Sequence, residues 1–479
     1  MELRRLALSG AKWTGAATMI ATVLQLTQIA VLARLLRPED FGLMALVVLV
    51  LGFAQTYADA GLSGAIVYRQ NTTREELSTL FWLNVSVGIV IFVVLTLSAP
   101  LLASAFGQAR LAGLIPLASL SFLVTPAGQQ FYALLQKELG FEALAAVDVV
   151  ASVVMAATAI VLAYRGHGVY SLVWGQLTGS VARSAALVGL GARGWKPLLR
   201  FRPAELRGYL RFGTFQMMEK TINFLSSNLD KLLIGSLIGT YGLGMYSVAF
   251  QVVMKPLQVV APIVNRVALP LFAKVQQDDV RLRAGFLDSI RAVAMALFPV
   301  YAGMILLADP LVHALLGTAW HATTPVLRIL AGLGFFYGLG NLIGPLLVAK
   351  GRVGMSFLLN VWRVTLYALA ISIGSMHGVQ GVAAGLVIAT ALGMFPIGFW
   401  VRWSLVRMRP AEYFAAFAPA LTAALSMAAC VLVARTVSSS LFGPLTELLL
   451  LTLLGALLYL LIIVPWQWAF ILRIGRSLR

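Results

Sequence analysis

Long hydrophobic runs alternate with short polar segments over the whole chain. A run of about 20 apolar residues is long enough to cross the hydrocarbon core of a bilayer as an α-helix. Fourteen such runs occur, near residues 13–33, 41–60, 80–103, 112–135, 145–164, 169–190, 212–237, 243–266, 286–308, 323–348, 355–374, 379–401, 413–434 and 445–466. The pattern therefore predicts an all-α polytopic membrane protein with about 14 transmembrane helices and no extracytoplasmic domain.

The seventh run carries many polar and charged residues for a membrane span. At about 100° per residue, a helix over 212–237 places five of them on one face within an arc of roughly 80°, namely Gln216, Glu219, Asn223, Ser226 and Asp230, with Lys220 and Lys231 beside that face. A charge at the centre of a bilayer costs from about 3 to more than 10 kcal/mol, so these side chains should face protein or water. The helix is predicted to form the wall of a polar cavity. The alternative is that its charges pair with neighbours inside a helix bundle.

The composition supports a membrane protein and excludes several function classes. Hydrophobic residues make up 60% of the chain and charged residues 11%, with a mean hydropathy of +0.89. The single cysteine, Cys430, excludes a disulfide framework, and four histidines without H-E-x-x-H spacing offer no catalytic zinc site. No G-x-x-x-x-G-K-[ST] motif is present, so ATP is not expected to be the direct energy source. No metal or organic cofactor is predicted.

The basic residues are distributed as membrane topology requires. The chain has 36 Lys and Arg against 18 Asp and Glu. With the N-terminus in the cytoplasm, 24 of these bases fall in the predicted inner segments and five in the outer ones. This split follows the positive-inside rule for an even number of helices with both termini cytoplasmic. The basic excess therefore indicates orientation, and a nucleic-acid partner is not expected.

An internal repeat divides the chain into two lobes. The segment RLLRPEDFGLMA at 34–45 aligns with SLIGTYGLGMYS at 236–247, which places Gly42 on Gly244. The displacement of six helices is even, so both copies have the same orientation, as in lobes related by a pseudo-two-fold axis along the membrane normal with a site between them. The predicted parts are an N-terminal lobe at 1–191 (helices 1–6), a basic cytoplasmic linker at 192–211, a C-terminal lobe at 212–405 (helices 7–12), and helices 13–14 with a basic tail at 406–479.

Two local features accompany this division. The linker could bind anionic lipid headgroups or serve as a flexible connection, and the sequence favours neither. Thr72 and Glu75 have the spacing of a capping box, which predicts the start of the third helix at this point.

The order of several segments resembles a known family. ARLLRPEDFG at 33–42, YADAGLSGAIVYRQ at 57–70 and LSTLFWLN at 77–84 resemble the start of bacterial polysaccharide transporters of the multidrug/oligosaccharidyl-lipid/polysaccharide exporter superfamily. NLDKLLIG at 228–235 and GLGMYSVAF at 242–250 resemble its seventh and eighth helices. The most similar branch contains O-antigen and exopolysaccharide flippases, including exporters of the colanic-acid type, and the resemblance covers helices 1 to about 12.

The resemblance implies a transporter and not an enzyme. Such a flippase would move an undecaprenyl-pyrophosphate-linked oligosaccharide across the bacterial inner membrane by alternating access. Membrane lipid and a polysaccharide polymerase are then candidate partners. Because no P-loop motif is present, an H⁺ or Na⁺ gradient is the hypothesis for the energy source.

A diphosphate and many sugar hydroxyls would require cations and amide groups inside the spans. The candidate substrate-binding residues are Gln28, Arg34, Arg183, Lys220, Asn223, Lys231, Lys255 and Arg363, and the candidate ion-coupling residues are Asp230 and Glu219. Alternatively, the arginines extend from span ends towards the membrane surface and the glutamines bond between helices.

Two other functions remain open on the sequence alone. A cation-coupled multidrug exporter would share the two-lobe architecture, although bases outnumber acids within the predicted spans. A membrane glycosyltransferase, polymerase or ligase would be expected to have an acidic metal-binding motif in a globular domain, and no segment of the chain is long enough for one.

Overall fold

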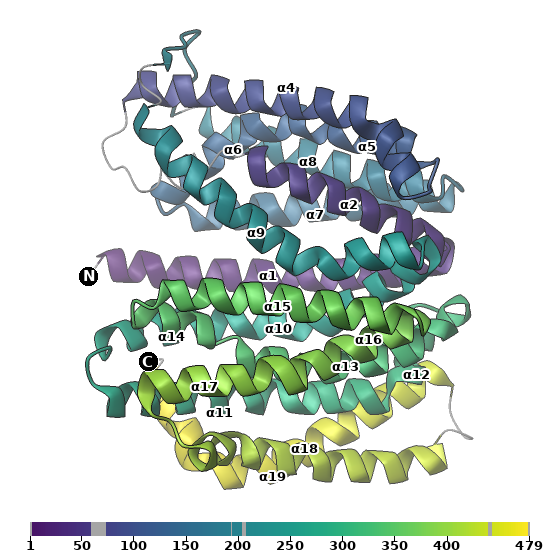
Figure 1. The fold of residues 1–479 in the computed structure, drawn as a ribbon, viewed down its shortest axis with the longest axis vertical. Helices are drawn as coiled ribbons and strands as arrows, with labels where there is room; N and C mark the ends of the chain where they lie inside the picture. Colours follow the sequence, from purple (N-terminus) through teal and green to yellow (C-terminus); the bar gives the residue numbers. More distant parts are fainter. Residues whose placement is uncertain (1, 59–72, 193, 204–206, 439–442, 478–479) are drawn as a thin grey trace. The chain divides into compact units, whose positions relative to one another are not determined.

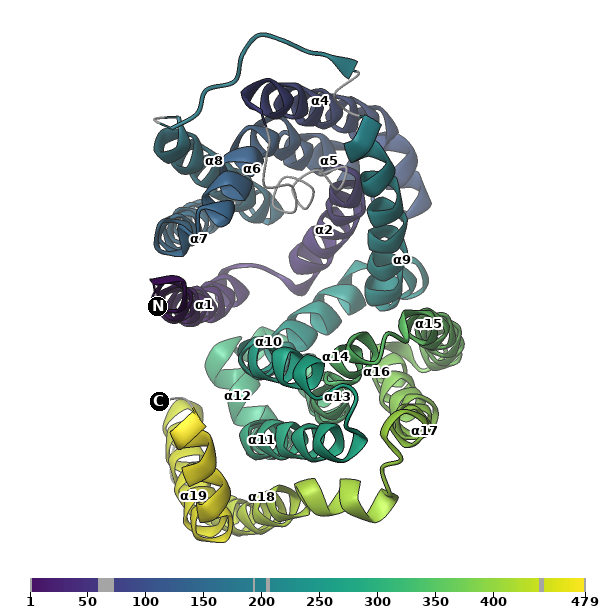
Figure 2. The ribbon, with the colours of Figure 1, turned by 90° about the vertical axis from the view of Figure 1, so that its left-hand side faces the viewer.

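The structure, a computed structural model, describes residues 2–58, 73–192, 194–203, 207–438 and 443–477 (Figure 1). Every regular element within these residues is a helix. The chain forms two compact units, Met1–Gly244 and Met245–Arg479. Figure 2 views many of the long helices of each unit nearly end on.

The first unit contains helices that pack side by side along most of their length. They are α1 (Glu2–Leu35), α2 (Pro38–Ala58), α4 (Arg74–Ala105), α5 (Leu111–Ser119), α6 (Ser121–Lys137), α7 (Phe141–Tyr164), α8 (Val169–Gly191) and α9 (Arg207–Leu237). The helix α7 packs against both α8 and α1, and α9 packs against α2. This last contact places α9 in the first unit, whereas the predicted lobes, which follow the sequence repeat, begin the second lobe at 212. The lobe division stays a prediction.

The second unit begins within α10 and contains the remaining helices. They are α10 (Thr240–Lys274), α11 (Asp279–Leu306), α12 (Ala308–Leu315), the 3₁₀-helix η2 (Thr318–Thr323), α13 (Thr324–Gly340), α14 (Ile343–Ala349), α15 (Val353–Ser375), α16 (Gly378–Ile388), the π-helical segment η3 (Ala389–Met394), α17 (Phe395–Val406), α18 (Pro410–Ser438) and α19 (Pro444–Ser477). The helix α11 packs against α13 and α18, α15 packs against α16, and α18 packs against α19.

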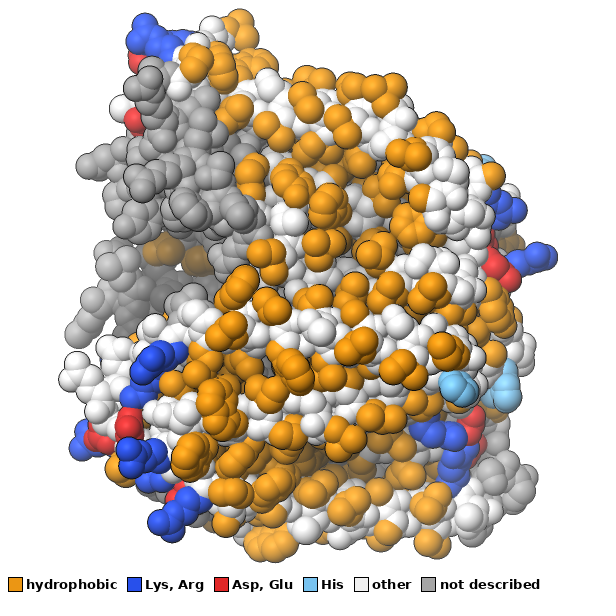
Figure 3. Space-filling model, viewed as in Figure 1, with side chains coloured by type: hydrophobic (Ala, Val, Ile, Leu, Met, Phe, Trp, Pro, Cys, Tyr) orange, Lys and Arg blue, Asp and Glu red, His pale blue; other side chains and the backbone are white. Residues whose placement is uncertain are grey.

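Twelve helical segments among the described residues are long and apolar enough to cross a membrane. They correspond to twelve of the fourteen predicted spans, and the protein is a polytopic membrane protein. The other two predicted spans coincide with α8 and α9, which are 23 and 31 residues long. Figure 3 agrees with a membrane environment, because hydrophobic side chains cover the middle of the helices and charged ones gather at the helix ends. The count of 14 stays a prediction.

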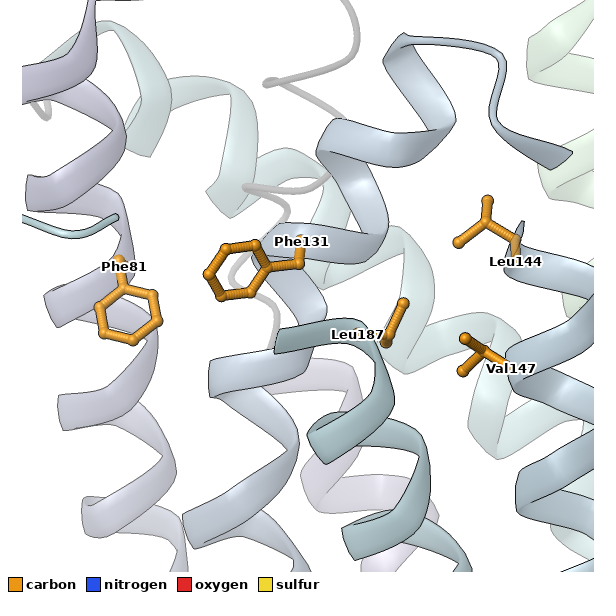
Figure 4. Close-up of a cluster of buried hydrophobic side chains, with 5 residues drawn as sticks. All are labelled: Phe81, Phe131, Leu144, Val147 and Leu187. Carbon is orange, nitrogen blue, oxygen red and sulfur yellow. The ribbon is translucent and has the colours of Figure 1, made fainter. Parts of the chain in front are cut away.

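A buried cluster joins four helices of the first unit. Phe81 of α4, Phe131 of α6, Leu144 and Val147 of α7 and Leu187 of α8 point towards one another, and each is at most 8% exposed (Figure 4). Lipid chains are as apolar as these side chains, so van der Waals packing, more than removal of apolar surface from water, stabilises such contacts.

The start of α4 lies one residue later than the sequence predicts. Thr73, not Thr72, is the N-cap: its side chain accepts from the Glu76 amide, and the Glu76 carboxylate accepts from the Thr73 amide. The segment TTREE at 72–76 contains two overlapping T-x-x-E pairs. The prediction took the first pair, whereas the structure forms the capping box with the second. Glu75 is thereby free of the cap and forms an ion pair with Arg200 of the linker.

The described part of the linker is attached to α4. The Leu198 amide donates to Ser78 Oγ at 3.0 Å, and Trp82 Nε1 donates to the Leu198 carbonyl at 2.8 Å. Trp195 packs against Phe81 and Phe131, with ring centroids 6.1 and 5.6 Å apart. These residues of the linker therefore lie against α4.

The two repeated turns contact each other through their glycines. A Cβ on Gly42 would lie 1.8 Å from the Thr240 carbonyl oxygen, and a Cβ on Gly244 would lie 1.9 Å from the Pro38 carbonyl oxygen. The two contacts are reciprocal, since each glycine of one repeat faces the first turn of the helix in the other. Gly42 and Gly244, aligned from sequence, occupy equivalent places in this contact. Only a residue without a Cβ permits the two backbones to approach this closely.

Candidate functional site

The polar face of α9 lies opposite the face that packs on α2. Thr221 Oγ1 donates to Tyr57 Oη at 3.1 Å, and the Phe224 ring lies 6.2 Å from that of Phe53. Helical periodicity places Ser226 and Asp230 roughly on the other side of α9 from Phe224. These two residues are nevertheless only 6% and 8% exposed. Asp230 is therefore enclosed by protein and does not face lipid.

The remaining α9 candidates differ in their exposure. Lys220 and Lys231 are half-buried and Asn223 is exposed, whereas the side chains of Gln216 and Glu219 lie outside the described residues. Lys231 Nζ donates to Asn228 Oδ1 at 3.0 Å, and Asn228 Nδ2 donates to the Phe224 carbonyl at 3.0 Å. Asn228 thus links the lysine to the backbone of the preceding turn.

The cavity of the first unit beside α9 is apolar. It has a volume of about 440 Å³ and is lined by α2, α4 and α9, with Phe53, Val90, Leu95 and Phe224 among its walls and Tyr57, Ser98 and Asn228 as its polar residues. This is not the polar cavity that the sequence predicts for the face carrying Asp230. The predicted polar cavity stays a prediction.

Three other candidates of the first unit lie on different helices. Arg34 is exposed in the last turn of α1, and Gln28 is half-buried one to two turns before it. Arg183 of α8 forms an ion pair with Asp148 of α7, with 2.9 Å between Nε and Oδ1, and its guanidinium lies 5.0 Å from the Tyr132 ring centroid. Arg183 therefore has partners within the protein, and its role in substrate binding stays a prediction.

The second unit places Arg363 in a polar cavity. The volume is about 380 Å³, and the walls come from α10, α13, α14, α15, η3 and α17. Its polar lining consists of Tyr337, Asn341, Ser356, Asn360, Arg363, Tyr367, Thr390 and Arg402. Lys255 of α10 is half-buried and is not among the lining residues.

Arg402 is the feature of this cavity that the sequence did not indicate. It directly follows the predicted span 379–401, so on sequence it falls among the 24 bases that indicate orientation. In the structure it is 1% exposed, and its guanidinium lies 4.3 Å from the Tyr413 ring centroid. The signal available in the sequence was the i, i+4 pair Gly398 and Arg402 on a helix rich in aromatic residues, which is too general to mark a site.

The fold is shared with lipid and drug transporters. A structure titled Lipid II flippase MurJ, in an inward closed conformation, superimposes with a TM-score of 0.78 over 96% of this chain and 99% of that chain, at 16% identity. An inward-facing multidrug resistance MATE family transporter of the MOP superfamily gives a TM-score of 0.67 over 83% and 98% of the two chains, at 18% identity. Together with the twelve apolar spans, these likenesses define the class: a polytopic membrane protein with the MurJ- and MATE-like fold.

The sequence comparisons define the family. The family described as polysaccharide biosynthesis protein matches residues 31–325. The lipopolysaccharide biosynthesis protein WzxC of Escherichia coli K12 is 36% identical over 389 residues, which cover 81% of this chain and 79% of WzxC. The chain belongs to the polysaccharide biosynthesis protein family. The resemblance seen in the sequence motifs is thereby confirmed.

Proposed function

We propose that this protein is a flippase that moves a polyprenyl-pyrophosphate-linked oligosaccharide across the bacterial inner membrane for exopolysaccharide or O-antigen assembly. The observation that carries the proposal is the combination of 36% identity to WzxC with the fold of the lipid flippase MurJ over 96% of the chain. The proposed cycle is alternating access of the two lobes, with both termini in the cytoplasm.

The chemistry of the candidate residues supports an anionic substrate. Arg34, Lys231 and Lys255 are proposed to bind the diphosphate or acidic sugars, because charge-assisted hydrogen bonds are about twice as strong as neutral ones. Gln28, Lys220, Asn223, Arg183 and Arg363 are proposed to contribute further polar contacts along the path. Asp230 is proposed to couple transport to an H⁺ or Na⁺ gradient, and its burial beside Lys231 supports this role.

A cation-coupled multidrug exporter is the second candidate, favoured by the MATE-like fold alone. Its substrates would be organic cations, for which a path lined by arginine and lysine is unfavourable. The family membership also favours the polysaccharide assignment, because the fold is common to both activities whereas the sequence match is to a polysaccharide biosynthesis protein.

The test is deletion of the gene in its own host, followed by two measurements. We expect the surface or secreted polymer to be lost and lipid-linked repeat units to accumulate, and the intact gene on a plasmid to restore both to normal. Resistance to ethidium is measured in the same strains. Normal polymer together with a loss of ethidium resistance would establish the multidrug exporter and overturn the flippase.

A further inference from the structure

The polar cavity of the second unit contains basic and neutral polar side chains but no carboxylate among its lining residues. The lining is otherwise apolar, with Leu257, Phe336, Ile343, Leu347, Leu359 and Met394 around the polar groups. Its volume of about 380 Å³ falls within the range of sites for small molecules, roughly 300–1,000 Å³. A cavity whose lining combines two arginines with apolar side chains suits an amphiphilic anion.

Arg402 supplies the strongest argument. Its Nε donates to the Gly398 carbonyl at 3.3 Å, and the Tyr413 ring covers one face of the guanidinium. Its Nη1 is buried and has no hydrogen-bond partner in the part of the chain that the structure describes. Leaving such a charged donor unsatisfied costs more than the roughly 1–3 kcal/mol of a neutral group. An anion that reaches Nη1 from the cavity would satisfy it.

Arg363 of α15 adds a second guanidinium to the lining of the cavity. Its Nε is likewise buried without a hydrogen-bond partner among the described residues. Asn360 and Tyr367 lie three residues before it and four after it on α15, so the three side chains share one face of the helix. The Tyr367 hydroxyl is held by Thr390 Oγ1 at 2.8 Å, which fixes this face against the π-helical segment η3.

Gly398 lies one helical turn before Arg402 and close to it. A Cβ on Gly398 would lie 2.9 Å from Ile343 Cδ1 and 3.4 Å from Arg402 Nη2. The guanidinium therefore lies at contact distance from the backbone of α17. The contacts that orient the arginine are its hydrogen bond to the Gly398 carbonyl and the Tyr413 ring.

We propose that this cavity binds a phosphate group carried by a lipid, with Arg402 and Arg363 contacting the phosphate and the apolar wall contacting the hydrocarbon. Two sources offer this chemistry: a phospholipid headgroup and the phosphate of a polyprenyl carrier. The proposal does not rest on the flippase assignment, because it concerns binding within the second unit and is tested without transport.

The experiment is native mass spectrometry of the full-length protein purified in detergent. The probes are phosphatidylglycerol, undecaprenyl phosphate, inorganic phosphate and, as a lipid without net charge, phosphatidylcholine. We expect a one-to-one complex with an anionic lipid, and about tenfold weaker binding for Arg363→Gln and for Arg402→Gln, since each removes a hydrogen bond to a charged group. Arg402→Lys should lose less. Preference for phosphatidylglycerol or for undecaprenyl phosphate identifies the source.

The control is Arg352→Gln, an exposed residue at the start of the same helix as Arg363 that does not line the cavity. It should bind as the wild type does. If Arg402→Gln does not fold, the lipid binding of Arg363→Gln tests the proposal on its own. Binding of inorganic phosphate alone, no binding of either anionic lipid, or equal binding by wild type and Arg363→Gln would overturn the proposal.

Discussion

At the scale of single residues, the carboxylate of Asp230 is buried within a long helix, whereas that of Asp309 lies at a helix end. Asp309 lies 2.9 Å from Arg328 and 3.1 Å from Arg435. These ion pairs join α12 to α13 and α18. Asp230 instead lies within α9, 8% exposed, on the face that carries Ser226. Its position inside a polar helix face is the reason to expect a role in the transport cycle.

Substitution of Asp230 separates charge from shape. Asp230→Asn keeps the size and hydrogen bonding but removes the charge, whereas Asp230→Glu keeps the charge. If ion occupancy biases the equilibrium between inward- and outward-open states, Asn should abolish polymer production in a deletion strain and Glu should retain part of it. The control is Glu142→Gln, the same chemical change at an exposed residue of α7. Equal activity of Asn and Glu variants would make Asp230 a structural residue.

Residue environments were predictable only where periodicity determines them. The spacing of Ser226 and Asp230 indicated a shared face that avoids lipid, and both are buried. The partner of Arg183 was not predictable, because Asp148 lies 35 residues away on another helix. Arg402 was missed for a similar reason: a base near the end of a hydrophobic run has the same sequence signal whether it reaches the membrane surface or turns inward under Tyr413.

At the scale of helices, the two repeated turns pack together through close backbone contacts at Gly42 and Gly244. Gly42→Ala and Gly244→Ala should each destabilise the protein by at least about 1–3 kcal/mol, because the added methyl group would overlap a carbonyl oxygen that belongs to the backbone and cannot rotate away. The measurement is the melting temperature of the purified protein, followed by size-exclusion chromatography after heating.

The matched control for these variants is Gly303→Ala in α11. A Cβ at Gly303 would have no atom within 4 Å. Within a helix, alanine is more stable than glycine by about 1 kcal/mol. This variant should therefore melt at the same temperature as the wild type or higher. A melting temperature unchanged by Gly42→Ala and Gly244→Ala would show that the two turns separate readily.

The attachment of the linker to α4 yields a prediction about local opening. Trp82→Phe keeps the aromatic packing but removes the indole N–H that donates to the Leu198 carbonyl, a loss of about 1 kcal/mol. Residues 195–203 should then exchange their amide hydrogens faster in hydrogen–deuterium exchange, while α18 is unaffected. Trp400→Phe, at an exposed residue of the second unit, is the control. Equal exchange in both variants would mean that the hydrogen bond does not restrain the linker.

At the scale of the whole molecule, hydropathy predicted the helices well but not their interruptions. The run at 112–135 is divided into α5 and α6 at Leu120, the run at 323–348 into α13 and α14, and the run at 379–401 contains η3. An interruption leaves the composition of a span unchanged, so average hydropathy does not reveal it. The orientation of helices was inferred from charge, and the number of crossings depends on the two helices with the weakest hydrophobic signal, α8 and α9.

Topology reporters can decide between 14 and 12 crossings if they are placed between these two helices. With the N-terminus inside, α1, α2, α4, the α5–α6 segment and α7 make five crossings. If α8 and α9 also cross, Lys196 lies in the cytoplasm; if neither crosses, it lies outside. The C-terminus is cytoplasmic with either 14 or 12 crossings, so a reporter after Arg479 alone does not distinguish these two topologies. If only one of α8 and α9 crosses, the C-terminus lies outside. Because six bases between 193 and 211 favour the cytoplasm, we expect reporters at Lys196 and Arg479 both to be active inside. If the reporter at Lys196 were periplasmic and the one at Arg479 cytoplasmic, the protein would have 12 crossings. The helix α9 would then not be part of the transport path.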